Sequence, residues 1–157
     1  MPNDSSLIIG LLVKNEQLLG ALYMVFTEIF PEAKEFWGGL AHEEAGHANL
    51  LLDLEAQERK GKIRLNKNRF NIAALDNFSG YVESLIEEGK SGKYDIQNAL
   101  CISLDLEDSL IEKGFFEIID EDSLIIKHAL QVLKDATIKH RDKIKDYLSR
   151  ILKTRDK

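Results

Sequence analysis

The chain has 157 residues, of which 44% are hydrophobic and 31% charged, and these proportions are typical of a single globular domain rather than a disordered segment. Its only cysteine, Cys101, excludes an intrachain disulfide and a metal site built from paired cysteines. The net charge is −6, although residues 127–157 hold ten basic and four acidic side chains. Because no interleaved aromatic residues or nucleic-acid motif accompany these charges, we interpret the segment as a solvated helix face and expect no nucleic-acid partner.

The N-terminal segment has the pattern of a soluble helix. Residues 6–29 form one periodic segment, which Ser5 or Ser6 can cap and Pro31 ends. Its apolar run is interrupted at residues 14–17, and no basic stretch precedes it, so we expect neither a signal peptide nor a membrane span. The expected location is therefore the cytoplasm, without a membrane partner.

Three further long elements and one short element follow. The second predicted helix covers residues 31–60, and Gly61 ends it. A connection over residues 61–94 contains a shorter predicted helix with the sequence NIAALDNFSGYVESLIEEG. The remaining predicted elements are a helix over residues 95–119 and a helix that runs from the possible caps Asp122 and Ser123 to about Leu152.

The order of these elements predicts an all-α fold. No segment shows the alternation of a β-strand between turns. Short joints at residues 30–31 and 120–123 favour antiparallel pairs, and the connection between the pairs is long enough to travel the length of a bundle. We therefore predict a ferritin-like four-helix bundle, with two antiparallel hairpins joined by a long crossover that contains an extra short helix, and one domain over residues 1–157.

Ionisable residues interrupt the apolar stripes of three predicted helices. Residues three, four and seven apart share a helix face, and on this basis Glu16, Glu107 and His140 each lie among apolar neighbours. Each of these side chains is therefore predicted to turn inward.

The second predicted helix contains the segment HEEAGH, residues 42–47. Glu44 and His47 are three residues apart and can reach one point. Glu43 is four residues from His47, so the spacing alone does not choose between the two acids. The Glu-x-x-His register favours Glu44 as a ligand.

Each long helix thus directs an ionisable group towards the core, where a carboxylate is costly unless a cation balances it. Some helix bundles solve this with two metal ions, held by one Glu from each of two helices and by Glu-x-x-His from each of the other two. Oxygen and imidazole ligands suit iron, with manganese or zinc as alternatives. The predicted ligands of a di-iron or single-metal site are Glu16, Glu44, His47, Glu107 and His140. The sixth position is Thr137, which cannot bridge two cations as a carboxylate does.

Over roughly residues 7–150 the chain resembles the rubrerythrin-like branch of the ferritin-like superfamily. The resemblance rests on Glu16 with Tyr23 seven residues further, and on the segments EEAGH, LDLEDSLIEKGFF and KDATIKH. It implies a buried di-iron centre and a non-haem oxidoreductase or peroxidase that acts on peroxide, oxygen or ferrous iron. Because the chain has one cysteine, it holds no Cys-rich electron-donating domain, and any electrons must come from an external donor.

Further residues and an alternative function complete the sequence-based expectations. Tyr23 and Tyr147 are candidate catalytic residues, as hydrogen-bond donors beside the metal ligands. Gly38, Gly39 and Gly46 are predicted to permit close helix approach. By analogy with ferritin-like bundles we expect a homodimer. The alternative function is a degenerate ferritin-like bundle without catalysis, which serves as a protein-interaction module.

Overall fold

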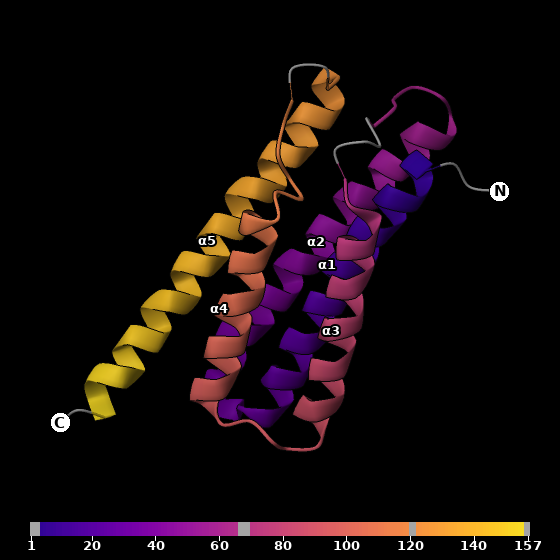
Figure 1. Ribbon diagram of the computed structural model, residues 1–157. Helices are drawn as coiled ribbons and strands as arrows, with labels where there is room; N and C mark the ends of the chain where they lie inside the picture. The colour runs from indigo at the N-terminus through magenta and orange to yellow at the C-terminus, as the bar shows by residue number, and fades with distance from the viewer. Residues whose placement is uncertain (1–3, 66–69, 120–121, 156–157) are drawn as a thin grey trace. The chain divides into compact units, whose positions relative to one another are not determined.

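The computed structural model describes residues 4–65, 70–119 and 122–155, and within these ranges it contains helices and no β-strand. The predicted all-α class is therefore confirmed for this part of the chain. The elements in chain order are α1 (Asp4–Ile29), the 3-10 helix η1 (Pro31–Ala33), α2 (Lys34–Arg59), α3 (Ile72–Lys90), α4 (Ile96–Glu112) and α5 (Leu124–Arg155) (Figure 1). They form two compact units, of which the first comprises Met1–Lys93 with Ile119–Ala129 and the second Tyr94–Ile118 with Leu130–Lys157.

The observed helix ends differ from the sequence predictions at two places. α1 begins at Asp4, so Ser5 and Ser6 lie inside the helix rather than at its cap. The hydroxyl of Ser5 instead accepts a hydrogen bond from the Leu65 amide at 3.2 Å. α4 ends at Glu112 rather than near residue 119, because Gly114 adopts a φ of +64°, which a helix cannot continue.

The predicted joint at residues 120–123 lies partly outside the described residues, since residues 120 and 121 are not described. Ser123 immediately precedes α5, and its Oγ accepts a hydrogen bond from the Ile126 amide at 3.3 Å. The hydroxyl thus satisfies one of the free amides in the first turn of the helix. The prediction that Ser123 caps this helix is confirmed.

In the first unit, α1 packs against both α2 and α3 (Figure 1). The turn between α1 and α2 is short because Pro31 opens η1, where its fixed φ and missing amide suit a first helical position. By length and composition α1 could also cross a membrane, but half of its most apolar 18-residue window is buried within the structure. Ile8, Leu19 and Phe26 are among the apolar residues of α1 that lie in the core, whereas Leu7 and Met24 are exposed.

Two polar contacts fix the direction of α3 along α1. Ser5 contacts Leu65, which precedes α3, and Asn15 contacts Ser79 within α3, where the Ser79 hydroxyl donates to the Asn15 Oδ1. Residue numbers thus rise together along the two helices, which run parallel. α3 is the shorter helix that the sequence predicts between the two hairpins, and it lies along α1.

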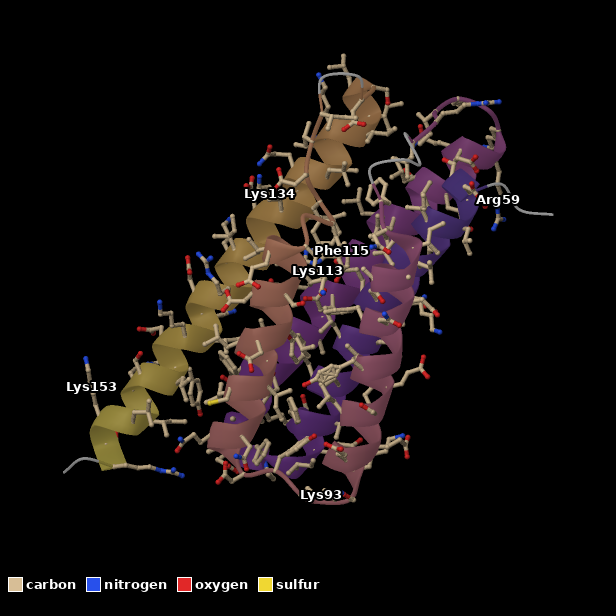
Figure 2. The ribbon with its side chains drawn as sticks, viewed as in Figure 1. Arg59, Lys93, Lys113, Phe115, Lys134 and Lys153 are labelled. Atoms are coloured by element: carbon tan, nitrogen blue, oxygen red, sulfur yellow. The ribbon has the colours of Figure 1, made fainter. Side chains whose placement is uncertain are left out.

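In the second unit, α4 and the described residues of α5 from position 130 onward run antiparallel. Gln97 bonds to Arg155 near the start of α4, Glu107 contacts His140 in its middle, and Glu117 beyond its end pairs with Lys134 at 3.2 Å. Figure 2 labels Lys134 on α5. Because the residue numbers fall along α5 as they rise along α4, the two helices form the second predicted antiparallel pair.

Candidate metal centre

The first unit brings together three of the five predicted ligands, Glu16 from α1 and both Glu44 and His47 from α2. Each offers one ligand atom, and these atoms all lie within 4.8 Å of one another. Glu16 is 2% exposed and Glu44 is 1% exposed, as the apolar stripes around them predict. The Nδ1 atom of His47 lies 3.3 Å from Oε2 of Glu44.

Helix geometry and one glycine explain this arrangement. Glu44 and His47 are three residues apart, so they share one face of α2. A Cβ atom added to Gly20 would lie 3.5 Å from Cβ of Glu44, so the helices approach closely one turn after Glu16. Of the two adjacent acids, Glu43 is exposed and Glu44 is buried. Glu44 is therefore the acid that faces the interior.

The role predicted for three other glycines is wrong. A Cβ atom added to Gly38, Gly39 or Gly46 would meet nothing within 4 Å. These positions therefore do not need glycine for helix packing. A side chain would reach the neighbouring helix at Gly20 and at Gly10, where an added Cβ atom would lie 3.7 Å from Oε2 of Glu55.

The charges of this group are unbalanced. Two buried carboxylates stand against one imidazole, and no lysine or arginine among the described residues is buried. Isolated buried carboxylates cost several kcal/mol unless a partner or a metal ion offsets the loss of hydration. A cation would therefore stabilise Glu16 and Glu44 in this position.

The donor set suits a transition-metal ion. Ligand atoms that share an ion at about 2.1 Å lie about 3 to 4 Å apart, and the 3.3 Å between His47 and Glu44 falls in that range. Two carboxylates and one imidazole suit iron, manganese or zinc. The three protein ligands leave coordination positions for water or substrate.

The second unit brings together the other two predicted ligands. Oε1 of Glu107 on α4 lies 3.4 Å from Nδ1 of His140 on α5, and the two residues are 0% and 1% exposed. This separation again fits two ligands of one ion. Both side chains therefore lie inward, as predicted, and they form a two-residue donor set.

The position three residues before His140 contributes no carboxylate. Thr137 is buried, and its hydroxyl donates a 2.7 Å hydrogen bond to the Leu133 carbonyl. Asp135 is exposed and accepts a hydrogen bond from Gln131, so it does not replace the missing acid. The neutral hydroxyl of Thr137 is thus turned to its own helix backbone.

The two candidate tyrosines have different surroundings. Tyr23 is fully buried in the first unit, with its ring centroid 5.7 Å from that of Trp37, which also packs at 4.8 Å against Phe26. Tyr147 is half-buried in the second unit, and the guanidinium of Arg150 lies 5.4 Å from its ring centroid. Tyr23 thus belongs to an aromatic core cluster, whereas Tyr147 lies beneath a charged side chain.

Sequence reasoning missed one polar residue beside the ligands. Asn15 precedes Glu16, is 2% exposed, and accepts a hydrogen bond from Ser79 on α3. The available signal was its position in an apolar helix, but its partner is 64 residues away in the sequence. Asn15 and Ser79 link the helix that carries Glu16 to α3.

Comparison with known proteins gives no match, because no protein-family model, no curated protein and no solved structure is significantly similar to the chain.

Proposed function

We propose that the chain is a rubrerythrin-like oxidoreductase with a ferritin-like fold, which binds iron in its core and acts on peroxide, oxygen or ferrous iron in the cytoplasm. The observation that supports this most strongly is the buried group of Glu16, Glu44 and His47, whose ligand atoms lie within 4.8 Å of one another. A metal ion would offset the negative charge of this group.

The side chains have distinct tasks in this proposal. Glu16 and Glu44 supply anionic oxygen ligands, and His47 supplies a neutral nitrogen ligand, whose Nδ1 lies 3.3 Å from Oε2 of Glu44. Glu107 and His140 form the ligand set for a second ion, completed by water because Thr137 supplies no carboxylate. Bound iron would supply the electrons for oxygen or peroxide chemistry.

The proposal also includes partners. An external electron donor would serve repeated turnover, since these 157 residues contain one cysteine. We propose a homodimer, by analogy with ferritin-like bundles. Size-exclusion chromatography with light scattering measures the assembly directly, and a monomer at all accessible concentrations would contradict the dimer.

Replacement of Glu44 by glutamine tests the metal site. Glu44→Gln keeps the side-chain volume but removes the anionic ligand, whereas Glu43→Gln makes the same change on the exposed neighbour. After growth with iron, we expect elemental analysis to give one to two ions per chain in the unaltered protein and in Glu43→Gln. The iron content of Glu44→Gln should be lower, because its affinity for the ion is expected to fall at least tenfold.

The same comparison shows how the proposal fails. Equal metal content in Glu43→Gln and Glu44→Gln would place any bound ion elsewhere. Protein that stays metal-free in iron, manganese and zinc would contradict the proposed function and favour the non-catalytic bundle. Circular dichroism of each variant confirms that the helices are retained.

A further inference from the structure

A groove of about 510 Å³ lies between α1 and α2 on the first unit, and Glu16 lines it. Its volume is within the range of sites for small organic ligands, about 300 to 1,000 Å³. The groove therefore leads from the surface to one of the buried carboxylates of the candidate metal centre.

Small residues create the groove. Gly20 on α1 and Gly38 and Ala41 on α2 line it, and the exposed side chain of Met24 forms part of the wall. A Cβ atom added to Gly38 would meet nothing within 4 Å, so the space beside this backbone is open. The predicted role of Gly38 in helix packing was wrong. The missing side chain of Gly38 instead leaves space in the groove.

The chemistry of the lining defines the ligand. The walls are mostly apolar, the polar side chains of Gln17 and His42 are exposed, and the described lining residues include no lysine or arginine. An anionic ligand would find no lysine or arginine there and only the exposed imidazole of His42, whereas an apolar body would be removed from water. Hydrogen peroxide and dioxygen have no such body and do not need a groove of this size.

We propose that this groove binds the apolar body of a neutral organic hydroperoxide, with the peroxide head directed at Glu16. This assignment rests on the proposed function and names its substrate class. In the reaction the O–O bond breaks on uptake of two electrons and two protons, which yields one alcohol and one water. If Glu16, Glu44 and His47 hold iron, the ferrous ion would supply one of these electrons, and the external one-electron donor would supply the other and reduce the iron again.

The first test measures binding to the metal-free protein. The chain has only two methionines, so selective ¹³C-methyl labelling gives a resolvable signal from Met24 in the groove. We expect 2-phenylpropan-2-ol, the alcohol product of cumene hydroperoxide, to shift this signal saturably. Gly38→Leu fills the groove, and Gly39→Leu is the matched control, because Gly39 has equally open surroundings but does not line the groove.

Binding of the alcohol is expected to weaken at least tenfold in Gly38→Leu and to stay unchanged in Gly39→Leu. The absence of a saturable shift in the unaltered protein, or equal affinities in the two variants, would overturn the assignment.

The second test uses the iron-loaded protein and compares the oxidation rates of bound ferrous iron by cumene hydroperoxide and by hydrogen peroxide. We expect the ratio of these rates to fall about tenfold in Gly38→Leu and to hold in Gly39→Leu, since the larger substrate needs the groove. An equal ratio in both variants would overturn the groove assignment while leaving the metal site intact. Failure to bind iron would instead refute the proposed function, and the alcohol titration would still decide whether the groove binds ligands.

Discussion

Thr137 is the residue whose side chain departs most from the ligand pattern of a two-metal bundle. It stands one turn before His140, and its hydroxyl donates to the backbone of its own helix. A hydroxyl in this state provides a weak neutral oxygen ligand, whereas a carboxylate would provide charge and a second oxygen. The second ion is therefore expected to bind more weakly than the first.

Replacement of Thr137 by glutamate should strengthen the second site. We expect Thr137→Glu to bind the second ion at least tenfold more tightly, because the new carboxylate adds an anionic ligand three residues before His140. Isothermal titration with manganese measures the two affinities. Thr137→Gln is the control for side-chain size, and equal affinities in the two variants would show that the charge at residue 137 does not reach a metal.

Among the contacts between α1 and α3 is one buried polar pair. The Ser79 hydroxyl donates to Asn15, and both residues are at most 2% exposed. Ser79→Ala would leave the Asn15 oxygen without this donor, and we expect the free energy of unfolding to fall by about 1–3 kcal/mol. Urea denaturation measures the change.

Ser84→Ala provides the control for this prediction. Ser84 is on the same helix, is exposed, and donates to the Tyr81 carbonyl. Its removal should change the free energy of unfolding by less than about 0.5 kcal/mol. Equal losses in Ser79→Ala and Ser84→Ala would show that the buried pair does not stabilise the contact between α1 and α3.

Alanine should change the free energy of unfolding in opposite directions at two glycines, one inside α2 and one just after it. Gly46 is exposed inside the helix with open space around it, so Gly46→Ala should raise the free energy of unfolding by up to about 1 kcal/mol. Gly61 follows the helix with a φ of +73°, where a Cβ atom is strained, so Gly61→Ala should lower it by about 1 kcal/mol. Stabilisation by both changes, measured in urea, would contradict the backbone argument.

The helices could be predicted from the sequence because their signals are local. Apolar periodicity located all five, and Pro31 and Ser123 marked two of their boundaries. The same periodicity predicted that Glu16 and Glu107 are buried. The end of α4 was missed because the predicted helix continued past Gly114, whose positive φ stops it.

Contacts between distant segments could not be predicted in the same way. Gly20 looked like any small residue of an apolar stripe, and its importance appears only when Glu44 is placed beside it. The partner of Asn15 is likewise on another helix. Periodicity gives the face on which a residue lies, but it does not give the residue that it meets on the neighbouring helix.

The molecule as a whole is acidic, and it also has acidic side chains in its interior. The net charge is −6, and the ten basic residues of segment 127–157 include none that is buried among those described. No lysine or arginine elsewhere in the described residues is buried either. A bound cation would balance buried carboxylates and would add stability to the folded state by mass action.

Anomalous X-ray diffraction at the iron edge, from crystals of the iron-loaded protein, tests whether the buried ligands hold iron. We predict an anomalous peak about 2.0 to 2.2 Å from the ligand atoms of Glu16, Glu44 and His47, and a second, weaker peak beside Glu107 and His140. The account would be contradicted by a map without a peak at the first group, in crystals where those three side chains are ordered and iron is present in excess.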